Sequence, residues 1–131
     1  ITDNDTVTVA SITDSNVTEG TDENHTVTMS GVATTAKTYP FTLADQTALA
    51  GADYNATAPT FTNGVTYDAV TGTITVPAGV STFDVAVPTI DDLIDENEEF
   101  YTITVGAVTA NGIITDNDTV TVASITDSNV T

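Results

Sequence analysis

A dense run of carboxylates between two predicted strands is the part of the sequence best suited to chemistry. Six acidic residues occupy positions 91–99: Asp91, Asp92, Asp95, Glu96, Glu98 and Glu99. Carboxylates packed this closely repel one another unless water or a cation separates them. The run is therefore either a solvated acidic loop or a site for a hard cation with oxygen ligands. Calcium suits the second interpretation, because it accepts about six to eight oxygens in flexible geometry, whereas magnesium takes few carboxylates and zinc prefers Cys and His.

A second acidic segment, Asp116-Asn117-Asp118, follows the last predicted strand. The strand that begins after Glu99 runs away from the first acidic run, and a hairpin at Gly106 or Gly112 returns the final strand beside it. In an antiparallel pair, the end of one strand lies beside the start of the other. We therefore expect both acidic segments at one end of the fold, which favours calcium over a solvated loop. The spacing fits neither an EF-hand nor a glycine-rich β-roll.

The elements that position these carboxylates are expected to be short β-strands. Apolar residues alternate with Thr, Asp or Ala in several stretches, a pattern typical of strands with one buried face. These stretches are 27–29, 39–43, 74–76, 83–87 and 101–105. Glycine-containing turn signals separate them, and no stretch keeps apolar residues at helical spacing over three turns. The sequence thus predicts an all-β domain of two packed sheets with about seven strands.

The two ends of the chain carry the same sequence. Residues 1–18 and 114–131 are identical, and their offset is 113 residues. Identity over this length indicates a tandem array of whole domains, or else a duplication introduced by cloning. In the tandem interpretation, residues 6–118 form the complete repeat. Residues 1–5 are then the tail of a preceding repeat, and residues 119–131 are the head of a following one.

Composition and charge exclude several classes of function. The 131 residues include 19 acidic side chains and a single basic one, Lys37, so the formal net charge is -18. Binding to nucleic acid is not expected, because no basic surface exists to neutralise phosphates. No apolar run approaches bilayer length, so membrane insertion is not expected either. The chain contains no cysteine, which leaves packing, hydrogen bonds or a metal to hold the fold together.

No arrangement of residues indicates an enzyme. The sequence offers no nucleophile with a base and no glycine-rich phosphate loop. Aromatic residues make up only 6% of the chain, and no sugar-binding platform accompanies the carboxylates, as a glycosidase would need. The single histidine, His25, is expected in an exposed turn. Five other acids are expected in solvent: Asp22, Glu23, Asp45, Asp68 and Asp84.

Five short motifs in a fixed order resemble those of Calx-β-type sandwich domains. They are Val17-Thr18-Glu19-Gly20, Gly51-Ala52-Asp53-Tyr54, Val76-Pro77-Ala78-Gly79, the acidic run from Ile90 to Glu99, and Ile114-Thr115-Asp116-Asn117-Asp118. The resemblance covers residues 7–118 and implies an immunoglobulin-like (Calx-β-type) antiparallel Greek-key sandwich that binds calcium. Because its ends repeat, the chain is also similar to the extender repeats of giant bacterial RTX adhesins, which serve biofilm formation or ice adhesion and leave the cell by type I secretion.

The resemblance also implies a set of calcium ligands. By motif match, these are Glu19, Asp53, Asp91, Asp92, Glu96, Glu99, Asp116 and Asp118. A main-chain carbonyl near Leu93–Ile94 is a further candidate. Leu93 and Asn117 stand where some relatives carry a third consecutive Asp, and Asn117 can still offer its amide oxygen.

The resemblance adds candidates at the junction between repeats. Asp14 is either a ligand of an ion in the linker or an ordinary turn residue. Asp3 and Asp5 correspond to Asp116 and Asp118 in the preceding linker. We expect the C-terminal copy to hold calcium, because its own domain supplies the acidic run. The N-terminal copy is expected to be half a site, which another molecule or the following strand must complete.

Taken together, the residues and the resemblance predict a non-catalytic, calcium-stabilised extender module of a tandem-repeat cell-surface adhesin, made rigid by calcium at the junction between repeats. We expect it outside the cell, at a bacterial surface, with adjacent identical repeats and calcium ions as partners. An isolated repeat is expected to be monomeric. One alternative is a ligand-binding adhesin module that recognises a sugar or a protein through calcium. A second alternative is a calcium-sensing regulatory domain.

Overall fold

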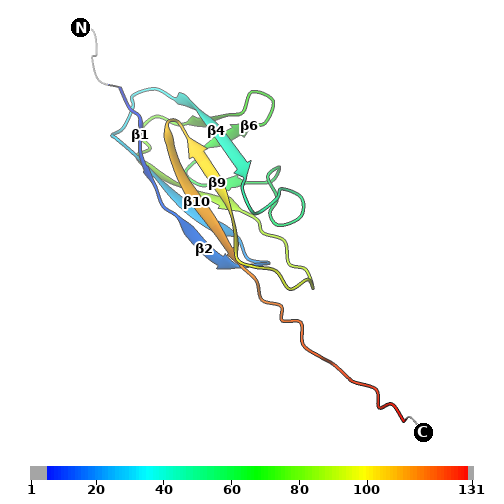
Figure 1. Ribbon diagram of the computed structural model, residues 1–131. Coiled ribbons are helices and arrows are strands. Elements are labelled where there is room, and N and C mark those ends of the chain that lie inside the picture. The colour runs from blue at the N-terminus through cyan, green and yellow to red at the C-terminus, as the bar shows by residue number, and fades with distance from the viewer. Residues whose placement is uncertain (1–5, 130–131) are drawn as a thin grey trace.

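Residues 6–129, the part of the chain described by a computed structural model, contain β-strands and no helix (Figure 1). The strands are β1 (Val9–Ile12), β2 (Ser15–Thr18), β3 (Glu23–Met29), β4 (Lys37–Asp45), β5 (Thr60–Phe61), β6 (Thr66–Asp68), β7 (Thr73–Val76), β8 (Thr82–Val87), β9 (Glu99–Val105) and β10 (Val108–Thr115). All five stretches predicted from alternation lie within these strands, in β3, β4, β7, β8 and β9. Over the described range there is accordingly no helix that could span a membrane.

Two sheets make up the fold, as predicted. One has the strand order β1-β3-β8-β5, and the other has the order β2-β10-β9-β4-β7-β6. Neighbouring strands are antiparallel except β2 and β10, which run parallel. The all-β sandwich is confirmed, but residues 6–129 form ten strands in place of about seven. The strands that the sequence did not reveal include β2, β5 and β6, which have four, two and three residues and are too short to show an alternating pattern.

One edge of the sandwich is formed by a segment that changes sheet. β1 pairs with β3 in the four-stranded sheet, and β2 pairs with β10 in the six-stranded sheet. Thr13 and Asp14 form the step between them. The Thr13 amide donates to the Thr26 carbonyl (3.0 Å), and Asp14 Oδ1 accepts from the Asn111 amide (2.8 Å). This step sets β2 beside β10. Glu19, the residue directly after β2, therefore lies at the end of the sandwich where β10 stops.

The core fills the space between the two sheets with their inward-facing residues. Burial alternates along β3, β8 and β9, as expected for strands with one buried face. Tyr54 and Tyr101 are fully buried and stack with ring centroids 4.5 Å apart. Tyr101 also lies across its β10 partner Gly112, where an added Cβ would lie 2.2 Å from Tyr101 Cζ. This packing ties β9 closely to β10.

Two polar side chains lie inside this core, so the prediction that His25 and Glu23 are exposed is wrong. Both are 0% exposed, because they share the inward face of β3 with Val27. The Thr13 carbonyl can only accept, so His25 Nδ1 donates to it (2.9 Å), and the Tyr101 hydroxyl donates to His25 Nε2 (2.8 Å). This neutral form agrees with burial, which lowers the pKa of His25.

Glu23 is the less well satisfied of the two. Its Oε1 accepts from the Val17 amide (3.0 Å), but its Oε2 accepts no hydrogen bond from the described residues. Burial raises the pKa of Glu23 from 4.5 to about 7. The folded protein therefore keeps this proton to a higher pH than the unfolded chain does. As a result, Glu23 lowers the free energy of unfolding as the pH rises through that window.

Replacing Glu23 by Gln should remove this loss. The free energy of unfolding of Glu23→Gln, relative to that of the wild-type chain, should increase by about 1–2 kcal/mol as the pH rises from about 5 to about 8, because the neutral amide has no charge to bury. Denaturant unfolding in calcium-free buffer at the two pH values measures the gain. Asp22→Asn, at the exposed neighbouring position, is the control and should show no such change. A difference from wild type that does not vary with pH would contradict the assignment.

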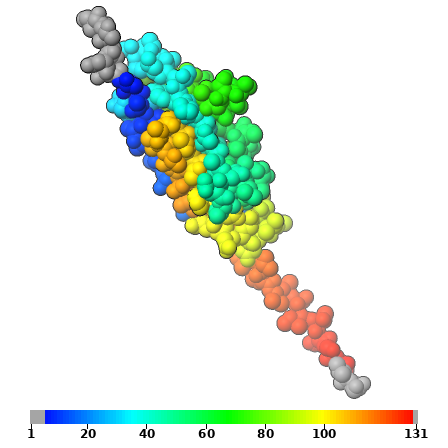
Figure 2. Space-filling view, turned by 45° about the horizontal axis from the view of Figure 1, so that its top comes forward, coloured from blue at the N-terminus to red at the C-terminus, as the bar shows by residue number. Residues whose placement is uncertain are grey.

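The two ends of the sandwich are formed by different segments. In Figure 1, β1 begins at one end, and β10 delivers the chain to the opposite end, from which residues 116–129 extend away without forming a strand. Figure 2 shows the loop 88–98 (yellow-green) beside this outgoing segment, and the loop before β4 (cyan) at the far end. The boundaries of the complete repeat, 6–118, stay a prediction.

Candidate metal centre

Strand pairing brings acidic segments together at the end of the sandwich where β10 stops. β2 runs parallel to β10, and just past it the Glu19 amide donates to the Thr115 carbonyl (3.0 Å). β9 runs antiparallel to β10, which sets Glu99 opposite Ile114. The hairpin between β9 and β10 turns at Gly106, the first of the two predicted positions. The two acidic segments therefore lie at the same end of the sandwich, as predicted.

The loops that complete this end are held by close backbone approaches. The Asp53 carbonyl accepts from the Ile90 amide (2.9 Å), which places the loop after β4 against the start of the acidic run. Gly20 has a φ of +91°, and a Cβ added to it would lie 3.0 Å from Asp91 Cβ. Glycine alone meets both conditions without strain. Gly20 therefore allows Glu19 to approach the acidic run.

Carboxylate oxygens from these segments form three overlapping groups. Within each group, one oxygen of every residue lies within 4.8 Å of the others. The groups are Glu19, Asp91 and Asp118; Glu19, Asp92 and Glu96; and Asp53, Glu96 and Glu99. Glu19 and Glu96 each belong to two groups. The three groups are therefore connected through these two residues.

The carboxylates at this end oppose one another's ionisation. Burial, together with the neighbouring carboxylates, raises the pKa of Glu19 to about 8. Burial and the same kind of neighbours raise the pKa of Glu99 to about 7, and burial raises the pKa of Glu96. Asp116 differs, because the Glu96 amide donates to Asp116 Oδ2 (2.8 Å) and holds the pKa of Asp116 low. A bound cation would reverse the effect on the raised groups by favouring their ionised forms.

Two carboxylate oxygens at this end are buried and accept no hydrogen bond from residues 6–129. They are Glu19 Oε1 and Asp118 Oδ2, and Glu19 as a whole is only 6% exposed. Leaving a buried polar atom without a partner costs about 1–3 kcal/mol, and more for a charged group. Two acceptors that face the same acidic cluster cannot satisfy each other while both are ionised. A cation between them would satisfy both.

The chemistry of the donor set fits calcium. All ligand atoms in the three groups are carboxylate oxygens, and His25 takes part in none of the groups found in the described residues. Four of these carboxylates, Glu19, Asp53, Glu96 and Glu99, also line a small cavity of about 10 Å³, roughly the space of one water molecule. Oxygen ligands in irregular arrangement are what calcium accepts, whereas magnesium needs a near-ideal octahedron with few carboxylates.

The structure brings together the ligands that the motif resemblance implies. Seven of the eight belong to the three groups, and the eighth, Asp116, accepts from the Glu96 amide and lines the same cavity. Asn117, which directly follows Asp116, is exposed. Asp95, which the motif match omitted, lies at the edge of the centre, where its Oδ2 accepts from the Val120 amide (3.2 Å). Its position inside the acidic run was the one available signal.

The candidates for an ion in the linker lie elsewhere. Asp14 is at the step between β1 and β2, where it accepts from the Asn111 amide, and it belongs to none of the three groups. This position favours the turn interpretation of Asp14. Asp3 and Asp5 lie outside the described residues, so the half-site at the N-terminal copy stays a prediction.

Solved structures with a similar fold come from Calx. The chain is similar to the apo-form Calx CBD1 domain, with a TM-score of 0.62 and 21% identity over 82% of this chain and 98% of that one. It is also similar to CBD12 from CALX1.2 (TM-score 0.62, 22% identity) and to the calcium-binding domain CBD12 of CALX1.1 (TM-score 0.63, 22% identity). Both of these matches cover 80% of this chain and 43% of the other, so the chain spans less than half the length of those structures. No family model and no curated protein matches the chain. Its fold is therefore the immunoglobulin-like, Calx-β-type sandwich that the sequence predicts.

Proposed function

We propose that this chain is a non-catalytic calcium-binding module that serves as an extender in a tandem-repeat adhesin at a bacterial cell surface. The observation that carries the proposal is the buried Glu19 carboxylate. Its Oε1 accepts no hydrogen bond among the described residues, and it belongs to two of the three carboxylate groups. The similarity in fold to a structure described as a calcium-binding domain supports the same cation.

Calcium at this end would join segments that are far apart in the sequence. It would neutralise carboxylates that otherwise repel, and it would tie the residues after β2 and β4 to the β8–β9 loop and to the segment after β10. Extracellular calcium modules bind with dissociation constants of about 10⁻⁴–10⁻³ M. With an affinity in this range, the module would be calcium-free and flexible in the cytosol, and calcium-bound and rigid outside the cell.

The repeated ends of the chain support the extender role. Asp118 belongs to the candidate centre, and the next residue, Thr119, is the copy of Thr6 at the start of the sandwich. An ion bound at Asp118 would therefore stiffen the connection to a following repeat. The chain also enters and leaves the sandwich at opposite ends, as a rod of repeats requires (Figure 1).

Small-angle X-ray scattering on a chain of several repeats tests the extender role. With calcium, we expect a rigid rod whose length grows in proportion to the number of repeats. With chelator, we expect a shorter average length and greater flexibility, because the linker carboxylates then repel without sharing an ion. Identical dimensions in both conditions would reject a role for calcium at the junctions. Saturable, calcium-dependent binding of one repeat to a glycan or a protein would instead favour the ligand-binding alternative.

A further inference from the structure

The single basic residue and the acidic run lie at opposite ends of the sandwich. The only basic residue, Lys37, is exposed at the start of β4 and shares a cavity with Thr6 and Val7, just before β1. The carboxylates of 91–99 and 116–118 occupy the opposite end, where β10 stops. When copies follow one another in line, Lys37 of one copy therefore faces the acidic end of the copy before it.

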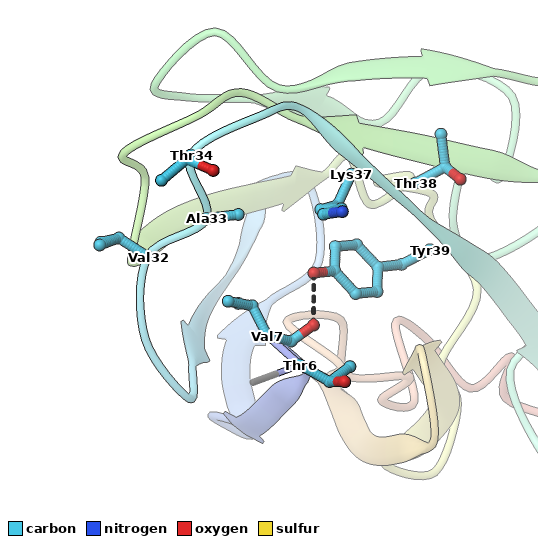
Figure 3. Close-up of a pocket in the computed structure, with 8 residues that line it drawn as sticks. All are labelled: Thr6, Val7, Val32, Ala33, Thr34, Lys37, Thr38 and Tyr39. Atoms are coloured by element: carbon cyan, nitrogen blue, oxygen red, sulfur yellow. Dashed lines mark hydrogen bonds between the residues drawn. The ribbon is translucent and has the colours of Figure 1, made fainter. Parts of the chain in front are cut away.

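The cavity beside Lys37 is large enough to receive side chains. Its volume is about 370 Å³, and its walls come from Thr6–Val7, from the loop 32–34 and from the first residues of β4. In Figure 3, Lys37 and Tyr39 project from β4 toward Val7, and the Tyr39 hydroxyl donates to the Val7 carbonyl (2.7 Å). Val32 is 59% exposed on the opposite wall. The cavity thus combines apolar side chains, among them Val7 and Val32, with threonines and one positive charge.

The acidic end carries an exposed apolar pair that matches this cavity. Leu93 and Ile94, which we name the apolar tip, are 91% and 64% exposed in the middle of the acidic run. The Ile94 amide donates to Asp92 Oδ1 (3.0 Å), a local turn that fixes the backbone beneath the tip. Covering two aliphatic side chains would recover hydrophobic free energy that is otherwise lost to solvent.

The chain itself shows how the two ends come together. Val120 is the copy of Val7, 113 residues further on. The Val120 amide donates to Asp95 Oδ2 (3.2 Å), the residue that directly follows the apolar tip. In a following repeat, Val120 would form the cavity wall that Val7 forms here, with Lys37 and Tyr39 of that repeat around it. The cavity and its lysine would then lie next to Asp95 and the apolar tip.

We propose that adjacent repeats dock end to end, with the apolar tip of one repeat in the cavity of the next and Lys37 of the next repeat paired with Asp95. This inference rests on the tandem arrangement proposed above but not on calcium binding. Each junction is then a protein–protein contact in addition to an ion site. The contact fixes the angle between neighbouring repeats and adds to the stiffening that an ion at Asp118 would give.

Disulfide trapping in a two-repeat chain tests this contact. Adding residues 19–131 after Thr131 gives such a chain, because Thr131 is the copy of Thr18. The sequence has no cysteine, so Asp95→Cys in the first repeat and Lys37→Cys in the second form a unique pair. We expect this pair to oxidise at least about tenfold faster than a pair made from Asp68→Cys and the same Lys37→Cys, because docking raises the effective concentration only at the acidic end. Equal rates for the two pairs would overturn the proposal.

A second set of variants tests the apolar tip. In the first repeat, Leu93→Ser together with Ile94→Ser should slow trapping of the Asp95–Lys37 pair about fivefold or more, since the tip then has little to bury. Val70→Ser, at a residue that is 96% exposed between β6 and β7, is the matched control and should leave the rate unchanged. Equal trapping rates in the tip variant and the control would overturn the proposed docking.

Calorimetry on the single chain keeps this inference separate from the proposed function. Calcium binding without preferential trapping would overturn the docking and leave the calcium proposal standing. Preferential trapping without calcium binding would support the docking and overturn the calcium proposal.

Discussion

Replacing Glu19 by Gln is expected to weaken calcium binding at least about tenfold, which corresponds to about 1.4 kcal/mol or more of binding free energy. Glu19 belongs to two of the three carboxylate groups, so one substitution affects both. The amide that replaces the carboxylate offers one oxygen in place of two and carries no charge to attract the ion. Isothermal titration calorimetry on the single chain measures the affinity.

Thermal unfolding should show the same effect with a distinctive sign. At about 10 mM calcium and a dissociation constant of about 10⁻⁴ M, one site adds about 2.7 kcal/mol of stability. The melting temperature of the wild-type chain should then rise by roughly 10 °C. In Glu19→Gln this rise should be less than half as large. Without calcium at pH 8, the variant should be more stable than wild type, because burial raises the pKa of Glu19 to about 8 and the amide has no charge to bury.

Asp68→Asn provides the matched control for Glu19→Gln. It also removes one potential negative charge, but Asp68 is exposed on β6 and belongs to none of the three groups. Its calcium affinity should stay within about twofold of wild type, because an exposed charge outside the site is screened by salt. Equal affinities for Glu19→Gln and Asp68→Asn would show that the three groups are not the calcium site.

The acidic end could be anticipated from the sequence because strand order alone sets it. Glu99 starts one strand of a hairpin and Asp116 follows the end of the other, so they meet because the turn at Gly106 sets Ile114 opposite Glu99. Glu19 could not be placed in this way. Its position depends on the parallel pairing of β2 with β10, which no local pattern of residues encodes. Only the motif resemblance connected it to the acidic run.

The buried polar residues show where sequence reasoning stops. His25 and Glu23 occupy inward positions on β3, on the same face as Val27. From the sequence, polar side chains at such positions are expected to be exposed unless their partners are known. The partner that makes His25 tolerable in the core is Tyr101, which is 76 residues away in the sequence. A buried hydrogen bond between side chains so far apart in the sequence depends on the packing of the whole sandwich, so no local pattern in either segment predicts it.

Gly112→Ala is expected to destabilise the fold by about 3 kcal/mol or more, because it forces a methyl group into a filled space. The added Cβ would lie 2.2 Å from Tyr101 Cζ and 2.5 Å from the Tyr101 hydroxyl oxygen. The ring cannot easily move aside, since it stacks on Tyr54 and its hydroxyl donates to His25. Denaturant and thermal unfolding measure the loss, and the melting temperature should fall by roughly 10 °C or more.

Gly31→Ala is the control for this substitution. A Cβ added to Gly31 meets no atom within 4 Å, and its φ is not in the positive range that disfavours alanine. We expect its stability to stay within about 0.5 kcal/mol of wild type. If Gly112→Ala were as stable as Gly31→Ala, the packing of Tyr101 across Gly112 would be wrong.

The effect of Gly112→Ala should also reach the candidate calcium centre, which contains no part of that residue. Gly112 pairs with Tyr101 on β9 and with Ser15 on β2. These two strands lead to Glu99 and to Glu19, so a displaced β10 separates ligands that the register otherwise holds together. We therefore expect Gly112→Ala to bind calcium more weakly than Gly31→Ala under conditions where both are folded. Equal affinities would mean that the loops, and not the strand register, hold the carboxylates in place.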